Sequence, residues 1–267
     1  LAVALLAQMF QDSLLPSSII AGTVMSACQE ANEWSCALQL LTQMPQLQMQ
    51  PDLICFNIAI SCCESPGTWR IALISLQEIL SRSLQVSSVS FNSAITACGK
   101  AGQWQAALKL LWQMPSSSLM PDVISYNAAV AACTQQWQVA LQLLWQMLPN
   151  DVAPVTDRGL KPVRRIFGAL STPVVTPDLI TYNAVVSACE KGGQWLVALS
   201  IFKRMLDMEP ALQPNRVTYQ GLLSACERES QWEVALDVLE RMKQSQQGAP
   251  SAMHVGSALH ALVKEKG

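Results

Sequence analysis

The stretch VSFNSAITAC, residues 89–98, decides the fold because related stretches recur along the chain. The copies are IIAGTVMSAC at 19–28, ICFNIAISCC at 54–63, ISYNAAVAAC at 124–133, ITYNAVVSAC at 180–189 and VTYQGLLSAC at 217–226. The first four copies follow one another at a spacing of 35 residues. Self-similarity at a fixed period of about 20–50 residues is the sequence signature of a repeat architecture.

A second set of recurring residues follows each block and predicts a second helix in every unit. Gly102 supplies a turn after the first helix of the third copy, and Pro115 ends the second helix. Neither helix could bury its apolar face alone, so neighbouring units must stack. We therefore interpret the recurring Trp and Met residues as packing between repeats, not as a cofactor site. They are Trp34, Trp69, Trp104, Trp137, Trp195 and Trp232, with Met44, Met114, Met147, Met205 and Met242.

Composition favours a packed protein over a disordered one, since 51% of the residues are apolar and 13% are charged. No run of about 18 apolar residues occurs, so we expect no membrane span. The opening LAVALLAQMF is in phase with the later second helices and is interpreted as repeat, not as a signal peptide. The sequence is thus expected to begin inside a repeat, with any targeting peptide upstream.

The cysteines follow the same period. Cys28, Cys63, Cys98 and Cys133 are each 35 residues apart, and Cys189 and Cys226 occupy the same place in later units. One cysteine per repeat predicts a small buried hydrophobic residue and a reducing compartment, in preference to a disulfide or a metal ligand.

Signals for catalysis are weak. The two histidines, His254 and His260, lie in the last, degenerate unit, and neither has a Cys or carboxylate at ligand spacing. Neither a Gly-rich phosphate loop nor a nucleophile motif is present. We predict no enzymatic activity, no cofactor and no metal.

Several motifs together carry a family resemblance. A 35-residue period, V/I-x-Y/F-N opening the first helix, A-C near its end, K-A-G at the turn, A-L-x-L-(L/F)-x-x-M in the second helix and P-D before the next unit resemble the pentatricopeptide repeat family. The resemblance covers nearly the whole chain. It implies an all-α, right-handed α-solenoid of stacked helical hairpins that binds single-stranded RNA one base per repeat, in a chloroplast or mitochondrion.

The predicted organisation follows the repeat boundaries. Residues 1–17 are the C-terminal part of a truncated repeat, and residues 148–177 are an inserted loop rich in Pro and basic residues. The last residues, 252–267, are the first helix of a degenerate terminal repeat. Complete repeats are predicted at about 18–52, 53–87, 88–122 and 123–147, with two more in 178–251.

The resemblance also implies two kinds of base-contacting residue. A β-branched residue near the start of each first helix would clamp the base, although plain packing is the alternative. Three residues later an amide would read the base, together with the last residue of the same repeat. The clamp residues are Ile19, Ile54, Val89, Ile124, Ile180 and Val217. The reading positions are Gly22, Asn57, Asn92, Asn127, Asn183 and Gln220, with the partners Asp52, Ser87, Asp122, Asp178, Asn215 and, for the last repeat, Ser251.

These pairs predict a sequence preference. Uracil presents an N3–H donor that suits a carboxylate, whereas cytosine presents a bare N3 that suits a hydroxyl or amide donor. With the family's preference of Asn for pyrimidines, the predicted core is C-U-U-Y, read 5′ to 3′ from the N-terminal side. The first and last repeats are not decodable. The aspartates also suit helix capping, and we expect capping to need a different side-chain direction from base contact.

Charge is unevenly distributed, and the pI near 5.7 is low for a nucleic-acid binder. Residues 1–157 carry 4 basic and 9 acidic groups, whereas residues 158–267 carry 13 basic and 10 acidic groups. Lys100, Lys191 and Arg228 share one repeat position that the resemblance places near the RNA backbone, and ordinary exposed turn residues are the alternative. A helical scaffold for protein partners is the competing function. Other RNA-processing proteins are candidate partners of the chain.

Overall fold

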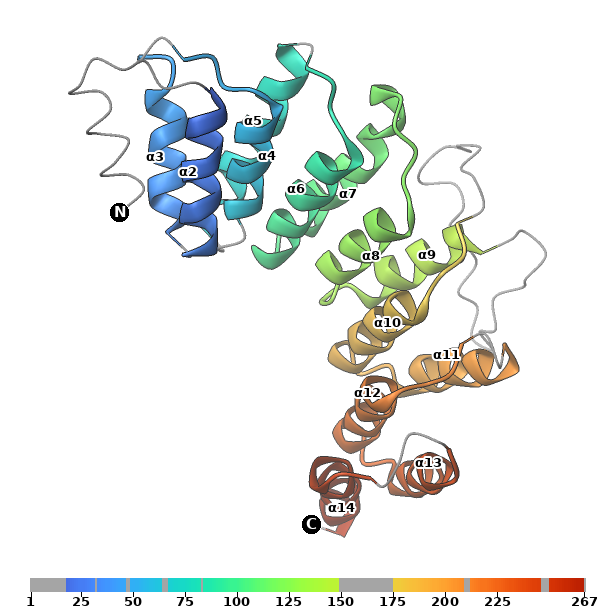
Figure 1. The fold of residues 1–267 in the computed structure, drawn as a ribbon. Coiled ribbons are helices and arrows are strands. Elements are labelled where there is room, and N and C mark those ends of the chain that lie inside the picture. Colours follow the sequence, from blue (N-terminus) through green and yellow to red (C-terminus); the bar gives the residue numbers. More distant parts are fainter. Residues whose placement is uncertain are drawn as a thin grey trace. The chain divides into compact units, whose positions relative to one another are not determined.

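The computed structural model describes residues 18–31, 33–46, 49–63, 67–82, 84–148, 175–208, 212–245 and 250–266 (Figure 1). Within these ranges every regular element is a helix. The truncated repeat predicted at 1–17 and most of the insertion predicted at 148–177 lie outside them. The chain divides into two compact units, Leu1–Ala132 and Cys133–Gly267.

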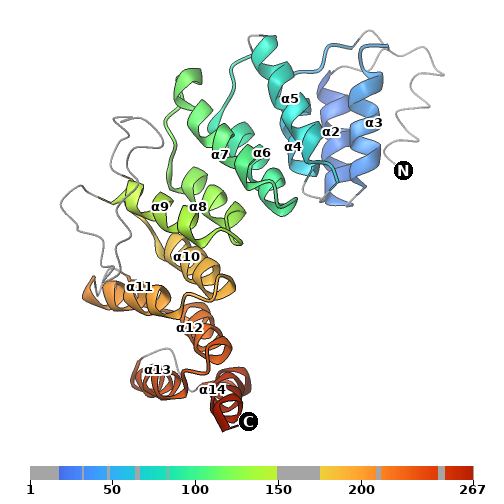
Figure 2. The same cartoon turned by 180° about the vertical axis from the view of Figure 1, so that it is seen from behind.

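The first unit is a stack of helical hairpins. Its first helices are α2 (Ser18–Glu30), α4 (Leu53–Cys62), α6 (Ser88–Lys100) and α8 (Val123–Ala132). The second helices are α3 (Trp34–Gln43), α5 (Trp69–Ser81) and α7 (Trp104–Gln113), and a 3-10 turn covers Pro115–Ser117. Each first helix packs against the next first helix, and each second helix packs against the hairpin that follows (Figures 1 and 2).

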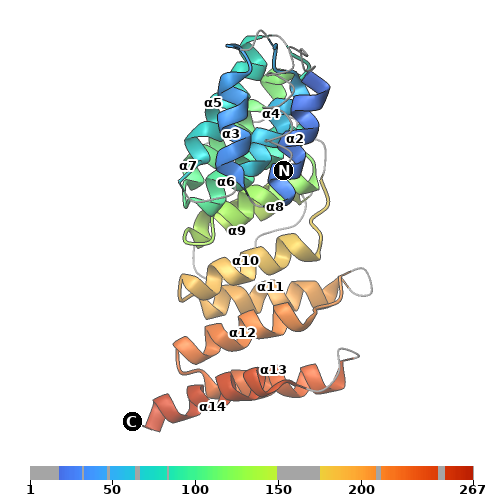
Figure 3. The same ribbon diagram turned by 60° about the vertical axis from the view of Figure 1, so that its left-hand side comes forward.

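The second unit repeats this arrangement. Its first helices are α10 (Leu179–Lys191), α12 (Arg216–Arg228) and α14 (Ala252–Lys266), and its second helices are α9 (Trp137–Met147), α11 (Trp195–Asp207) and α13 (Trp232–Gln244). Helices α10, α12 and α14 follow one another in the stack (Figure 3).

Recurring apolar residues form the core of both units. The five recurring methionines are at most 1% exposed, and the six recurring cysteines are buried with free thiols. Burial raises the pKa of Cys98 to about 11 and that of Cys133 to about 12, so these thiols are protonated near neutral pH. The prediction that these cysteines act as small core residues is confirmed.

The tryptophans are less buried than a purely internal packing role predicts. Trp34 is 37% exposed, and the others are half-buried. Trp137 contacts Gly192 of the next repeat, so one edge of its ring packs between repeats and the rest faces solvent. Because an indole ring is large, Trp is rarely buried completely.

Close helix packing depends on small residues. A Cβ atom at Gly99 in α6 would lie 2.9 Å from the Cβ of Ala132 in α8, so only glycine permits this approach. Gly102 ends the hairpin turn with φ +70°, a conformation that favours glycine. Among the described helices none is long and apolar enough to span a membrane.

Candidate nucleic-acid interface

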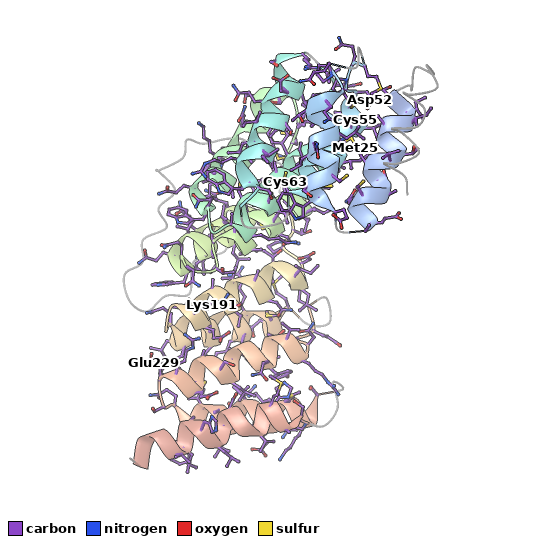
Figure 4. All side chains as sticks on the ribbon, turned by 90° about the vertical axis from the view of Figure 1, so that its left-hand side faces the viewer. Met25, Asp52, Cys55, Cys63, Lys191 and Glu229 are labelled. Atoms are coloured by element: carbon purple, nitrogen blue, oxygen red, sulfur yellow. The ribbon has the colours of Figure 1, made fainter. Side chains whose placement is uncertain are left out.

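The residue before each first helix caps that helix with its side chain. Asp52 Oδ1 accepts a hydrogen bond from the backbone N–H of Cys55, the third residue of α4, at 2.9 Å. The same bond joins Ser90 to Ser87 at 3.4 Å, Ser125 to Asp122 at 2.8 Å, Thr181 to Asp178 at 2.9 Å and Thr218 to Asn215 at 3.1 Å. Figure 4 shows Asp52 and Cys55 together at one end of α4 and Cys63 at the other. These contacts satisfy backbone donors that a helix leaves unpaired at its N-terminus.

In three of the cap residues, capping leaves part of the side chain for another contact. In Asp52 and Asp122 the bond to the helix backbone uses Oδ1, and Oδ2 takes no part in the cap. In Asn215 the cap uses Oδ1, so the amide nitrogen is the group that remains. In these three residues the cap uses one side-chain atom and leaves a second one, so capping by itself does not occupy the whole side chain.

A buried hydroxyl lies behind each cap. Ser90, Ser125, Thr181 and Thr218 are the third residues of their helices, and each is 0% exposed. The corresponding residue of α4 is Cys55, whose thiol donates to the carbonyl of Ser18 at 3.7 Å. Because a buried hydroxyl without a partner is costly, the acceptors of these groups are informative.

Three of these hydroxyls donate to the amide oxygen of the preceding repeat. Asn57 Oδ1 accepts from Ser90 at 2.6 Å, Asn92 Oδ1 accepts from Ser125 at 2.7 Å, and Asn183 Oδ1 accepts from Thr218 at 2.6 Å. In unit two, the Nδ2 group of Asn183 also donates to Asn215 Oδ1 at 3.3 Å. The structure thus brings each amide together with the start of the following first helix.

Two of the remaining predicted reading positions, Gly22 and Gln220, differ from these three asparagines. Asn127 is half-buried in α8, and Gly22 is buried in α2. Gln220 donates through Nε2 to Ser224 Oγ at 3.1 Å within its own helix α12. Gly22 has no side chain, and the printed bond of Gln220 stays within its own helix, so neither position shows the contact that characterises Asn57, Asn92 and Asn183.

The predicted clamp residues are exposed apolar side chains. Their exposures are 72% for Ile19, 62% for Ile54, 60% for Val89, 65% for Ile124, 64% for Ile180 and 62% for Val217. They lie one residue before the buried hydroxyl position and three before the reading position. Their side chains are not part of the core, so plain packing inside the fold does not explain their recurrence. β-branched residues are also not favoured by helix propensity at these places.

Two family models match the repeats. The PPR repeat family matches residues 86–135, and the pentatricopeptide repeat domain matches residues 165–227 and 208–250. The chain belongs to the pentatricopeptide repeat family. A search of curated proteins finds no significant relative.

Solved pentatricopeptide repeat (PPR) proteins have the same fold. PPR10 from maize is 23% identical with a TM-score of 0.54, and the match covers 98% of this chain and 39% of that protein. The PPR domain of Arabidopsis thaliana protein-only RNase P 1 in complex with tRNA is 15% identical with a TM-score of 0.55, over 78% of this chain and 95% of the domain. These likenesses establish an all-α helical-repeat solenoid.

Two features of these PPR repeats were not predicted from the sequence. The buried hydroxyls form one, although the recurrence of Ser or Thr before the aromatic residue in four of the blocks was a visible signal. The other is Met253 in α14, which is 69% exposed. It lies two residues after Ser251, the same spacing that separates each clamp residue from its cap residue. His254 takes the place of the hydroxyl, with Nδ1 accepting from the backbone N–H of Ser251 at 3.0 Å.

The three predicted backbone-contacting residues lie at the opposite end of the PPR first helices. Lys100, Lys191 and Arg228 are the exposed last residues of α6, α10 and α12, about 16–18 Å along the helix from its first turn. Figure 4 shows Lys191 at this end of α10. Arg228 lies 3.9 Å from a carboxylate oxygen of Glu190. Burial raises the pKa of Glu190, and the charges of Arg228 and Lys191 oppose that shift.

Proposed function

We propose that this PPR protein binds single-stranded RNA, with one base held at each repeat. The observation that carries the proposal is the exposed clamp residue in every first helix, 60–72% exposed in the six predicted positions. An isolated exposed isoleucine needs no explanation, but a β-branched residue exposed at the same place in each repeat does. A flat base offers an apolar face of suitable size, and its edge would meet the amide one helical turn away.

The cap residues suggest how each base is distinguished. Oδ2 of Asp122 is suited to the N3–H group of uracil, and this supports U at the repeat of Asn92. Asn215 uses Oδ1 in its cap and has Nδ2 to offer, which suits the bare N3 of cytosine better than the N3–H of uracil. We therefore narrow the expected C-U-U-Y core to C-U-U-C.

Basic residues supply the electrostatic part of the proposal. Contacts of Lys100, Lys191 and Arg228 with phosphates would make binding depend on salt, with a slope of about −2 in log K against log salt for three contacts to a single strand. The proposal assigns RNA recognition to the chain and no catalytic step. The family resemblance supports an organellar location, chloroplast or mitochondrion, which cell fractionation would test.

Fluorescence anisotropy with a short labelled RNA tests this function. A CUUC core between adenosine flanks is compared with a GAAG core in the same flanks, from about 50 to about 200 mM salt. We expect tighter binding of CUUC, and a loss of about fivefold to tenfold in affinity on Asn92→Ala or Asn127→Ala. Gln105→Ala, an exposed amide on α7, is the matched control and should change nothing.

Two results would contradict the proposal. Equal affinity for CUUC and GAAG would remove base reading, and the absence of RNA binding would favour a scaffold for protein partners. A wild-type affinity in both Asn variants would show that the amides serve only the stacking of repeats.

A further inference from the structure

The buried hydroxyls hold the reading amides from behind. Ser90, Ser125 and Thr218 are completely buried, and each contacts an asparagine 33 or 35 residues earlier in the chain. Each contact joins the first turn of one repeat to the reading position of the repeat before it. The hydroxyl is therefore placed to decide which end of the amide faces outward.

The distances indicate which end of the amide the hydroxyl holds. The three contacts measure 2.6, 2.7 and 2.6 Å, typical of an O–H group donating to oxygen and shorter than the usual N–H···O distance of about 2.9–3.0 Å. A hydroxyl has one proton to donate, and the amide oxygen is its nearest acceptor in each case. Ser125 Oγ, for example, lies 2.7 Å from Asn92 Oδ1 and 2.8 Å from Asp122 Oδ1, so its one proton lies between two acceptor oxygens, of which the amide oxygen is the nearer.

The second amide end is also constrained in Asn183. Its Nδ2 group donates to Asn215 Oδ1 at 3.3 Å while its Oδ1 accepts from Thr218 at 2.6 Å. Turning this amide over would place two oxygens against each other and would leave the Thr218 hydroxyl without its nearest acceptor. The structure thus specifies one orientation.

The repeats of this chain show the same pairing in sequence. Every asparagine at a reading position is followed in the next repeat by Ser or Thr at the third position of the first helix. The two reading positions that hold Gly or Gln are followed by a residue without a hydroxyl group. The pairs are Asn57 with Ser90, Asn92 with Ser125, Asn127 with Thr181 and Asn183 with Thr218, against Gly22 with Cys55 and Gln220 with His254. A residue needed only to start a helix would not depend on the side chain of the preceding repeat.

We propose that these hydroxyls are positioning residues that select pyrimidines by locking the amide with Nδ2 outward. The inference rests on the proposed RNA-binding function. Cytosine and uracil share the O2 acceptor, whereas guanine has an amino donor and adenine a C–H group at the corresponding edge. An outward Nδ2 donor matches O2 and repels the guanine amino group. An amide free to turn over would present Oδ1 and accept from guanine.

Removing one hydroxyl tests whether it holds the amide in this orientation, a role called the lock below. Ser125→Ala frees Asn92, and we measure affinity for RNAs with U, C, A or G at the first U of the CUUC core. We expect discrimination against G at this nucleotide to fall by about fivefold to tenfold, with the neighbouring nucleotides read as before. Ser125→Thr keeps the hydroxyl, as Thr218 does naturally, and should restore the wild-type ratio.

The controls separate positioning from stability. Ser125→Ala in an Asn92→Ala background should leave discrimination unchanged, because no amide remains to be held. Cys55→Ala removes the side chain at the same position where the preceding repeat offers only Gly22, and it should also have no effect on discrimination. Thermal unfolding of each variant shows whether it remains folded at the assay temperature.

Building a new contact between a hydroxyl and an amide provides a second test, in which base discrimination is gained instead of lost. A Cβ at Gly22 would lie 3.8 Å from Ile54 Cγ2 and 3.9 Å from Cys55 Sγ, so a side chain fits and starts beside the hydroxyl position. Gly22→Asn with Cys55→Ser should create a preference for U over G immediately 5′ of the core, and Gly22→Asn alone should create a weaker one.

The outcomes distinguish the two proposals. Pyrimidine preference in the wild type with full discrimination in Ser125→Ala overturns the lock and leaves the proposed function standing. No pyrimidine preference in the wild type overturns both. Equal preference in the single and double variants of Gly22 would also overturn the lock.

Discussion

Replacing Ile54 with alanine is expected to weaken RNA binding while hardly changing stability, and Ile60 in the same helix provides the opposite control. Both residues are isoleucines of α4, six positions apart. Ile54 is 62% exposed and Ile60 is 0% exposed. The same chemical change is thus made once on the proposed clamp and once in the core.

The expected magnitudes follow from burial. Full burial of an isoleucine side chain is worth about 1.5–3 kcal/mol, so the buried two fifths of Ile54 contribute about 1 kcal/mol. The better helix propensity of alanine returns about 0.4 kcal/mol, which leaves a net loss of roughly 0.5 kcal/mol. Ile60→Ala loses the whole side chain and leaves a cavity, so about 2–5 kcal/mol is expected.

The two variants should affect RNA affinity in the opposite order from stability. If Ile54 covers one face of a base, its loss should cost about 1 kcal/mol, or about fivefold in Kd. Ile60 lies in the core and should not affect Kd under conditions where the variant stays folded.

Urea unfolding followed by circular dichroism gives the stability change, and anisotropy with the CUUC RNA gives Kd. An Ile54→Ala variant as destabilised as Ile60→Ala would show that Ile54 is a packing residue. An unchanged Kd in a stable Ile54→Ala variant would refute the clamp.

Four further predictions concern the fold. Burial raises the pKa of Cys133 from 9.0 to about 12 in the folded protein. The contribution of this thiol to stability is therefore fully present below pH 9 and is lost as the pH rises from 9 to 12. Urea unfolding near pH 8 and pH 11 should show this loss. The same burial should protect Cys133 from iodoacetamide at pH 8 while half-buried Cys36 reacts, as mass spectrometry would detect; equal labelling would contradict it. Gly99→Ala should destabilise the first unit by about 1–3 kcal/mol, because the added methyl group would clash with Ala132. Ser230→Gly should stabilise the second unit by about 1 kcal/mol, because Ser230 has φ +56°, a conformation that glycine adopts without strain. Thermal unfolding of each variant measures the sign and size of the change.

Helix positions were accessible to sequence reasoning because the signals are local. Gly102 marks the turn after α6, and Pro115 follows the end of α7, as expected from the conformations these residues favour. The recurring cysteines are buried as predicted, since a small apolar residue at one helical position in each unit faces the same neighbour. The tryptophans were predicted less well, because the space between helices and the size of the ring decide together how far it is buried.

The candidate site was only partly accessible. The family resemblance, together with their recurrence, predicted Asn92 and its equivalents as reading positions, but it did not predict their hydrogen-bond partners. Ser125 reads in sequence as an ordinary residue of the first helical turn, and its role depends on a contact 33 residues away. Met253 was missed because the terminal repeat has lost most of the motif.

By itself the sequence determined that the chain repeats a pair of helices, where the turn and the second helix of the third unit lie, and which residues are spaced to share one face, because period, caps and turns act over a few neighbouring residues. Only the tertiary structure decided that the residues at the clamp position stay exposed and that a buried hydroxyl of one repeat holds the amide of the repeat before it. Those properties depend on how closely successive first helices pack, and side chains more than thirty residues apart meet only after that packing has formed.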